Sequence, residues 1–276
     1  MLEFAKFLKK APVYILIILC ALSALFPLYY MFVTAFKSQT EFYDNPFGIP
    51  LKPTLENIIN VMVEKQFYKY LLNTILLTVV STLIAIIVSV FASFAYAKKR
   101  FKGRDTCFNL TIGLTSVPAI VVLVPLYAVL AKLGMLNTYF GTSLVYAGFM
   151  LPFCVFVLTS FFKTIDNEII DAAKVDGCSE ISLIARIFIP LSKPALITLF
   201  IIDGLWVWNE LLIALLLLQD NDKRTLVVQL GLFQGRYVYS PTLIMAGSLF
   251  VGLPMIIIYL IGQKYFVKGL TSGAIK

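Results

Sequence analysis

Long apolar stretches separated by shorter polar connections dominate the pattern of this 276-residue chain. An α-helix needs about 20 apolar residues to cross the roughly 30 Å hydrocarbon core of a bilayer. The pattern therefore predicts an all-α, polytopic transmembrane helical bundle that forms a single domain over residues 1–276. The six expected transmembrane helices cover residues 13–36, 71–97, 108–130, 140–162, 194–218 and 242–259. The first apolar run is too long for a signal peptide and no clear small-residue cleavage site follows, so we expect a retained anchor.

Composition agrees with a membrane protein and excludes several kinds of chemistry. Hydrophobic residues make up 60% of the chain, charged residues 14%, and the mean hydropathy is +0.90, well outside the usual soluble range. The absence of histidine excludes catalytic triads with histidine and HExxH zinc sites. No nucleotide-binding glycine motif occurs and the four cysteines have no CxxC spacing, so we expect no cofactor, metal site or disulfide framework in this chain.

The basic residues predict how the chain is oriented. Of the 23 Lys and Arg residues, 15 lie on the side of the two termini, counting the connections between the expected helices. The positive-inside rule then places both termini in the cytoplasm of a multi-pass protein. Because the basic residues gather at the ends of apolar runs, anionic membrane lipid is a better partner for them than nucleic acid, which we do not expect to bind.

Two further patterns concern how the helices pack. Small residues recur every three or four positions along the second helix and share one face, which predicts close helix packing: Thr74, Thr78, Thr82, Ala85, Ser89 and Ser93. Prolines interrupt the third, fourth and sixth helices at Pro118, Pro125, Pro152 and Pro254. They predict kinks that accompany a moving or cavity-lining role, or else are tolerated without a role; both interpretations stay open.

The connection over residues 163–193 is long enough for two short helices beneath the membrane. Asp166 can cap the first helix, and Gly177 is placed to end it in the left-handed conformation. Ser179 can cap a second helix, which Pro190 is expected to stop. One apolar stripe of that second helix is expected to contain Ile181, Ile184, Ala185 and Phe188.

The first of these helices, in the sequence EIIDAAKVDG, has the character of a docking surface. Ala172 and Ala173 give it a face without bulk, to which another protein can approach closely. Glu168, Asp171 and Asp176 add an acidic rim. The alternative is an amphipathic loop helix that packs on its own bundle.

The fifth helix contains a second set of polar residues, in the sequence IIDGLWVWNELL. Asp203 and Glu210 are seven residues apart and so project from nearly the same face. A carboxylate inside a membrane is costly, and both are candidates for lining a translocation path together with Trp208 and Asn209. Alternatively, Glu210 lies at the outer interface and Asp203 pairs with a polar group of a partner subunit. Asn73, at the outer end of the second helix, is a weaker candidate.

The 163–193 connection resembles a known motif. The sequence EIIDAAKVDGCSEISLIARIFIPLSKPAL is similar to the EAA loop of permease subunits of ABC importers, with Gly177 four residues after the second Ala and Pro190 thirteen residues further on. The stretches VPLYAVLAKLGMLNTY, LPFCVFVLTSFFKTI, WNELLIALLLL and GLTSGAIK resemble the carbohydrate-uptake branch, especially second permease subunits of maltose-type and multiple-sugar systems. The chain departs from that pattern at Asp171, where Glu is usual, at Cys178, where Ala is usual, and in lacking a final Gly.

The resemblance implies a function and a set of partners. It implies the ABC importer permease fold, with a coupling helix that docks on a cytoplasmic ATPase through Glu168, Asp171, Ala172, Ala173, Asp176, Gly177 and Pro190. It also implies a second homologous permease subunit, an ATPase dimer that binds the ATP and Mg, and an extracytoplasmic sugar-binding protein, all at a prokaryotic cytoplasmic (inner) membrane. The chain would then be a non-catalytic subunit of a sugar or oligosaccharide importer.

Two other functions remain to be weighed. An ion-coupled secondary transporter or channel subunit would use the carboxylates Asp203 and Glu210, but such folds usually carry internal repeats, which this sequence lacks. An intramembrane aspartyl protease would need two acids at similar depth on facing helices, whereas these two share one helix.

Overall fold

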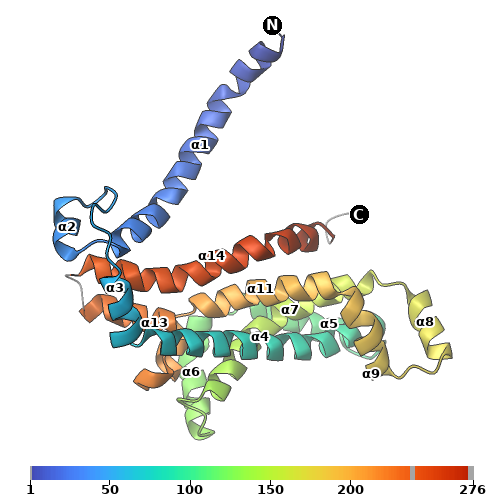
Figure 1. The fold of residues 1–276 in the computed structure, drawn as a ribbon. Coiled ribbons are helices and arrows are strands. Elements are labelled where there is room, and N and C mark those ends of the chain that lie inside the picture. The colour runs from blue at the N-terminus through green and yellow to red at the C-terminus, as the bar shows by residue number, and fades with distance from the viewer. Residues whose placement is uncertain (1, 237–239, 273–276) are drawn as a thin grey trace. The chain divides into compact units, whose positions relative to one another are not determined.

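The computed structural model describes residues 2–236 and 240–272, and in these ranges every regular element is a helix (Figure 1). Contacts between residues divide the chain into two compact units. The first unit contains the residues up to Tyr68 together with Leu230–Leu253, and the second contains Lys69–Gln229 together with the chain from Pro254 onward.

The first unit begins with the long helix α1 (Leu2–Ala35). Three shorter elements follow it: α2 (Gln39–Asp44), α3 (Glu56–Ile59) and a π-helical turn over Asn60–Glu64. The unit also includes parts of two later helices, α13 (Leu226–Arg236) and α14 (Pro241–Ser272). Just beyond α1, the buried Lys37 ammonium group donates hydrogen bonds to the carbonyl oxygens of Asn45, at 2.6 Å, and Pro46, at 3.2 Å. Burial lowers the pKa of Lys37, and the nearby Glu41 carboxylate opposes that shift.

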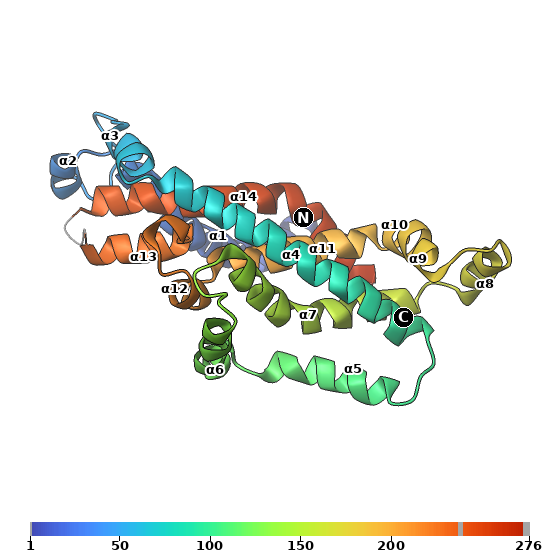
Figure 2. The ribbon, with the colours of Figure 1, turned by 90° about the horizontal axis from the view of Figure 1, so that it is seen from below.

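The second unit contains the helices that carry the candidate sites. In chain order they are α4 (Phe67–Lys98), α5 (Arg104–Gly113), a 3-10 turn (Leu114–Ser116), α6 (Ala119–Lys132), α7 (Tyr139–Lys163), α8 (Asn167–Val175), α9 (Glu180–Leu183), a π-helical turn (Ile184–Phe188), α10 (Ile189–Leu191), α11 (Lys193–Asn209), α12 (Leu212–Leu217) and a 3-10 turn (Asn221–Lys223). Helix α8 lies beyond one end of α4 in both ribbon views (Figures 1 and 2).

Four helices of the described chain are long and apolar enough to cross a membrane, at Pro12–Ala35, Phe67–Lys98, Tyr139–Lys163 and Pro241–Gly262. Two bent pairs bring the number to six if each pair is one span. The all-α transmembrane bundle expected from the sequence is therefore confirmed. Two of the six expected spans contain breaks.

The third expected span, 108–130, is broken rather than continuous. Its two halves, Arg104–Ser116 and Ala119–Lys132, meet at an angle of 102°. Pro118 stands at the start of α6 with an extended backbone (φ −63°, ψ 131°). Proline also restricts the residue before it to extended conformations, and Val117 is extended here. The break therefore follows directly from Pro118, whereas Pro125 is accommodated inside α6.

The fifth expected span, 194–218, is also interrupted. Helix α11 ends at Asn209, the backbone of Glu210 is extended, and α12 begins at Leu212. No proline or glycine lies at this break, so the sequence signals used for helix ends did not detect it.

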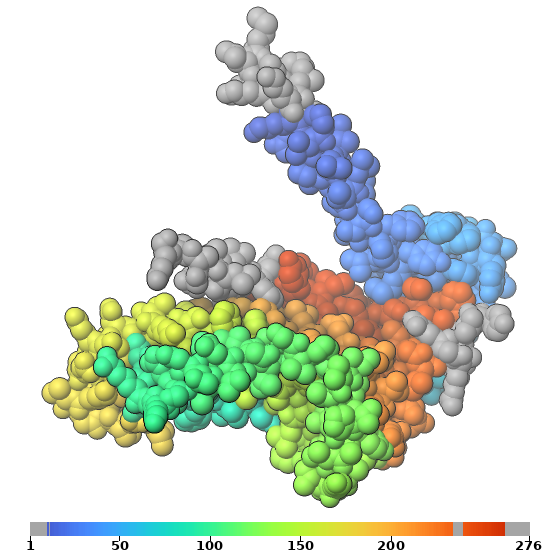
Figure 3. All heavy atoms as spheres, turned by 180° about the vertical axis from the view of Figure 1, so that it is seen from behind, coloured from blue at the N-terminus to red at the C-terminus, as the bar shows by residue number. Residues whose placement is uncertain are grey.

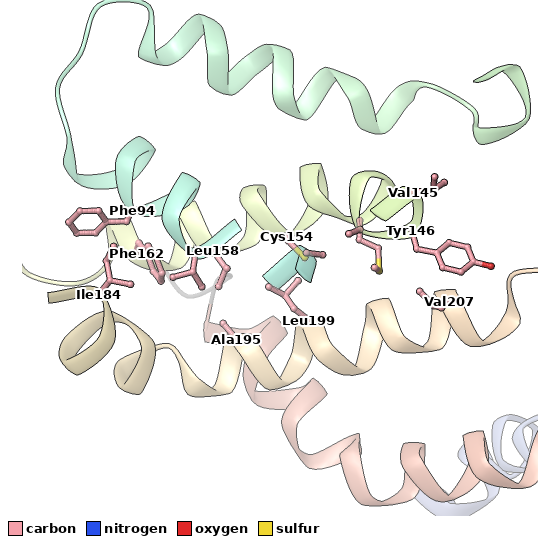
Figure 4. Close-up of a cluster of buried hydrophobic side chains, with 14 of the residues drawn as sticks. Phe94, Val145, Tyr146, Cys154, Leu158, Phe162, Ile184, Ala195, Leu199 and Val207 are labelled. Atoms are coloured by element: carbon pink, nitrogen blue, oxygen red, sulfur yellow. The ribbon is translucent and has the colours of Figure 1, made fainter. Parts of the chain in front are cut away.

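The core of the second unit forms where α7 packs against α4 and α11 (Figure 4). The small-residue face predicted on the second helix is confirmed, because all six of its residues are buried on α4: Thr74, Thr78, Thr82, Ala85, Ser89 and Ser93. A Cβ atom added to Gly204 of α11 would lie 3.4 Å from the methyl carbon of Thr78. Small side chains on both helices thus let α4 and α11 approach closely.

Candidate functional site

The first helix of the 163–193 connection forms as the sequence predicts. Asp166 occupies the N-cap position of α8 with extended backbone angles, although its side chain makes no capping hydrogen bond. At the other end Gly177 adopts a left-handed φ of 78°. Its N–H donates to the carbonyl of Lys174 and the N–H of Cys178 donates to the carbonyl of Ala173. These two bonds form a Schellman motif, which ends the helix and turns the chain back.

The second helix of this connection differs from the prediction in two respects. Ser179 caps it as expected, because its hydroxyl oxygen accepts a hydrogen bond from the N–H of Ser182. The predicted stop at Pro190 is one residue early, since the helix ends at Leu191 and the chain bends by 77° before α11. The π-helical turn just before the proline, in which the N–H of Ile189 bonds to Ile184, widens the helix and accommodates the proline ring.

The buried face of the second helix also differs from the predicted apolar stripe. Ile184 and Phe188 are buried as expected, and Leu183 joins them at 1% exposure. Ile181 is 72% exposed and Ala185 is exposed too, so both were wrongly placed in the apolar stripe. The buried residues and the half-buried Ile187 follow ordinary α-helical spacing, so the predicted stripe was simply centred on the wrong side of the helix.

Helix α8 turns most of its surface to the outside. Ile170 is its one buried residue and Ala173 is half-buried against the core, while Ala172 and Val175 are exposed. The three predicted rim acids are exposed as well: Glu168, Asp171 and Asp176. In the space-filling view the yellow residues of this segment form a protrusion at one end of the surface (Figure 3). The second unit therefore presents a small, partly apolar and acid-rimmed surface.

The candidates on the fifth helix are held against α7. Asp203 is only 4% exposed, and its carboxylate accepts a hydrogen bond from the Cys154 thiol, with 2.8 Å between Sγ and Oδ2. Figure 4 shows Cys154 within the buried cluster. Burial of a carboxylate beside one weak donor is costly. Asp203 thus serves the contact between α7 and α11 within this chain.

Glu210 closes the break between α11 and α12. Its carboxylate accepts hydrogen bonds from the backbone N–H groups of Ile213, at 2.8 Å, and Ala214, at 3.0 Å, at the start of α12. It also accepts one from the Tyr146 hydroxyl of α7 at 2.9 Å. A carboxylate in this position satisfies N–H groups that have no partner inside the helix and interacts favourably with the helix dipole. The charge of Glu210 therefore stabilises the interruption of the fifth span.

The two carboxylates do share a face, as the sequence predicts. Cys154 and Tyr146, their partners, lie eight residues apart on the same helix, α7. These two partners were missed because neither residue type nor spacing marks them in the sequence. Next to Glu210 the candidate Asn209 is exposed, and its side-chain amide donates to the carbonyl of Leu205.

The two tryptophans of this stretch differ in their surroundings. Trp208, the candidate, is buried at 2% exposure, whereas Trp206 is 38% exposed. The ring of Trp206 meets that of Tyr146 edge to face, with 5.8 Å between their centroids. Trp206 is thus the tryptophan that combines exposure with an aromatic contact to α7.

Asn73 connects α4 to the loop between α12 and α13, residues 218–225. Its amide nitrogen donates to the carbonyl oxygens of Asp222, at 2.8 Å, and Arg224, at 3.0 Å. Its amide oxygen accepts from the Tyr139 hydroxyl at 2.8 Å. The next residue, Thr74, accepts a hydrogen bond from the N–H of Leu226. Asn73 therefore fixes the position of the loop 218–225.

The arrangement of spanning and broken helices defines a polytopic membrane protein, and comparison with known proteins gives its family. Residues 85–272 match the model of the family described as "Binding-protein-dependent transport system inner membrane component". The chain belongs to this family, and it is a multi-pass inner-membrane permease subunit of an ATP-driven ABC importer of the carbohydrate-uptake type. Such a subunit is a transport component without catalytic function or cofactor of its own.

Individual relatives match almost the whole chain. The trehalose/maltose transport system permease protein MalG of Thermococcus litoralis is 35% identical over 272 residues, 98% of each chain. The arabinooligosaccharides transport system permease protein AraQ of Halalkalibacterium halodurans is 30% identical and covers 93% of this chain and 92% of its own. A chain from the crystal structure of a bacterial ABC transporter involved in import of the acidic polysaccharide alginate superposes with a TM-score of 0.81, at 25% identity and covering 94% and 96%.

These matches decide between the functions weighed from the sequence. Membership of a family of ATP-driven importers excludes the two other hypotheses, the ion-coupled transporter and the intramembrane protease. Among the described residues no group of three or more His, Cys, Asp or Glu side chains could hold a metal ion.

Proposed function

We propose that this chain carries sugars or oligosaccharides across the membrane as one of two homologous permease subunits, and that its whole length forms one permease domain. An ATPase dimer that binds ATP and Mg and an extracytoplasmic sugar-binding protein complete the importer. The relatives named above support a saccharide substrate. The excess of basic residues on the side of the termini supports cytoplasmic ends, which puts α8 on the cytoplasmic side as well.

In this proposal α8 is the coupling helix that docks on the ATPase. The observation that carries it is the exposed face of α8, which ends in a left-handed glycine and buries only Ile170 in its own chain. Ala172 permits a partner's backbone to come close, and Val175, at 88% exposure, offers an apolar contact. The carboxylates of Glu168 and Asp171 favour a partner surface with basic groups at its edge. Pro190 lies on the return from the docking surface to α11.

Docking at this surface would convert ATP binding into movement of the permease. Closure of the ATPase dimer shifts α8, the permease subunits rock from inward-facing to outward-facing, and hydrolysis resets them. A ligand can shift an equilibrium between two conformations only through its different affinity for each. In this importer that difference would arise at the docked α8.

We propose further that the junction between α11 and α12 borders the translocation path. Asn209 is exposed there and offers an amide to sugar hydroxyl groups. Trp208, Asp203 and Glu210 would shape the path through their positions in α11 and at its end, and not all by direct contact. Asn73 would act at the outer end by holding the loop 218–225.

The docking proposal is tested by Ala172→Arg in the importer purified with its native partner subunits. Ala172 is exposed, so the arginine should leave folding and membrane insertion intact while it blocks the approach of the ATPase. We expect co-purification of the ATPase to fall by at least about tenfold, which corresponds to about 1.4 kcal/mol of binding free energy. The matched control is Thr106→Arg, at another exposed site, which should bind the ATPase normally.

The outcome against this proposal is also clear. An Ala172→Arg complex that retains its ATPase and hydrolyses ATP at the wild-type rate in response to loaded binding protein would exclude docking at α8. The same preparation identifies the substrate, because the sugars that stimulate hydrolysis in the wild-type complex can be compared directly.

A further inference from the structure

Two adjacent lysines at the end of α4 hold the segment that contains α8. The Lys98 ammonium group donates hydrogen bonds to the carbonyl oxygen of Ile165, at 2.6 Å, and to Oδ1 of Asn167, at 2.9 Å. Lys99 pairs with the carboxylate of Glu180. Hydrogen bonds that involve an ionised group are stronger than neutral ones. The end of α4 is thus joined to two separate points of the connection.

These two points lie on either side of α8. Ile165 and Asn167 are at its beginning, and Glu180 follows Gly177 at the start of α9. Lys98 and Lys99 therefore fix both ends of the α8 segment to one helix. Both lysine side chains are half-buried, but the Glu180 side chain is 61% exposed, so solvent screens the Lys99 pair.

Between these fixed points α8 does not pack closely along α4. A cavity of about 200 Å³ separates them, and it is lined by residues of α4, α8 and α9: Phe94, Lys98, Lys99, Asn167, Ile170, Asp171, Lys174, Glu180 and Leu183. Lys174 and Asp171 form an ion pair at the edge of this cavity, with 3.8 Å between Nζ and Oδ1. The two lysines therefore add polar connections to the apolar anchoring of α8 by Ile170 and Ala173.

The far end of α4 holds the loop 218–225 through Asn73, and Thr74 accepts a hydrogen bond from the N–H of Leu226, which follows the loop directly. The whole helix is 32 residues long, and its rise from Asn73 to Lys98, 25 residues further on, is about 38 Å at 1.5 Å per residue. Its sequence contains neither proline nor glycine, whereas each of the other three long helices contains an internal proline. Sharp kinks in helices occur at such residues, so α4 is the stiffest direct connection between the α8 segment and this loop.

We propose that Lys98 and Lys99 are positioning residues that make α4 a rigid link between the ATPase-docking segment and the loop 218–225. Movement of the docked α8 is passed to α4 through Lys98 at one end of the segment and Lys99 at the other. Helix α4 then displaces the loop through Asn73 and Thr74. This inference rests on the proposed docking of the ATPase at α8.

The test is hydrogen–deuterium exchange of the whole importer, with its native partner subunits in lipid nanodiscs, with and without Mg and the non-hydrolysable analogue AMP-PNP. In the wild-type complex we expect the nucleotide to change exchange in α8 and, by at least about fivefold, in the loop 218–225, since coupling free energies between sites typically correspond to 5- to 150-fold effects. In Lys98→Met the change in α8 should remain while that in the loop falls below about twofold.

Three further variants separate coupling from folding. Lys98→Arg keeps the charge and should restore the response of the loop, and Lys102→Met, at an exposed position in the same basic segment, should behave as wild type. Glu180→Gln removes only the partner of Lys99 at the surface and should weaken the response without affecting assembly. It therefore keeps the test valid if Lys98→Met does not fold.

The outcomes distinguish this inference from the proposed function. A wild-type response of the loop in both Lys98→Met and Glu180→Gln, or no response of the loop in the wild type while α8 does respond, overturns the link and leaves docking in place. No response of α8 to the nucleotide in the wild type, together with normal ATPase binding by Ala172→Arg, overturns docking itself.

Discussion

Substitution of Gly177 by leucine separates two physical reasons for a glycine at the end of α8. The backbone of Gly177 has a φ of 78°, and a Cβ atom added there meets nothing within 4 Å in this chain. The cost of leucine in the free subunit is therefore backbone strain alone, about 1–2 kcal/mol for a left-handed conformation. That cost would reduce the population of the native turn by roughly five- to thirtyfold relative to competing conformations.

The companion variant is Gly177→Asn, because asparagine tolerates the left-handed conformation. If the turn alone matters, asparagine should sustain transport and leucine should impair it. If the ATPase approaches Gly177 closely, both side chains should impair transport, although the asparagine variant retains its fold. Proteoliposomes containing the complete importer allow sugar uptake and ATP hydrolysis to be measured on the same sample, and thermal unfolding of the isolated permease reports the strain.

Leucine at this position should leave membrane insertion intact, because Gly177 lies outside the spanning helices. Wild-type uptake and wild-type stimulated ATP hydrolysis in Gly177→Leu would refute the reasoning. Such a result would mean that coupling requires neither the left-handed turn nor the absence of a side chain at the end of α8.

Two further substitutions test the contacts around the other candidates. Asp203→Asn is expected to leave the melting temperature unchanged or to raise it, because removing the charge relieves a desolvation cost that one thiol donor offsets poorly. A decrease of more than about 1 kcal/mol in the free energy of unfolding would show that the charge itself stabilises the bundle. Asn73→Asp replaces an amide donor by a carboxylate opposite two carbonyl oxygens, so the loop 218–225 should detach more often. Trypsin should then cleave the loop about tenfold faster, which corresponds to a decrease of about 1.4 kcal/mol in the free energy of local opening. Unchanged proteolysis of that variant would contradict the role of Asn73 in holding the loop.

Features that depend on neighbouring residues in the chain were predicted well from the sequence. The apolar runs gave the positions of the long helices because crossing a bilayer requires a continuous apolar length. Gly177 ended α8, and Ser179 capped the next helix, because helix ends depend on the conformation and hydrogen bonding of single residues. The small-residue face of α4 was likewise readable from its spacing.

The errors occur where the local rules have exceptions that the sequence does not mark. Pro190 was expected to end a helix, yet the preceding π-helical turn accommodates it and the helix ends one residue later, at Leu191. The interruption after Asn209 carries no proline or glycine and is stabilised by a side-chain carboxylate. In each case, hydrogen bonds that form only in the folded chain determine where the helix ends.

The sequence by itself determined that this is a membrane-spanning helical protein with an exposed, acid-rimmed segment ended by glycine. The final stretch GLTSGAIK, which resembles the same family, extends beyond the described residues. Only the tertiary structure decided which residues far apart in the chain meet: Asp203 with Cys154, Glu210 with Tyr146, and Lys98 with the start of α8. The physical reason is that periodicity and capping act over a few residues, whereas such partnerships depend on how whole helices pack.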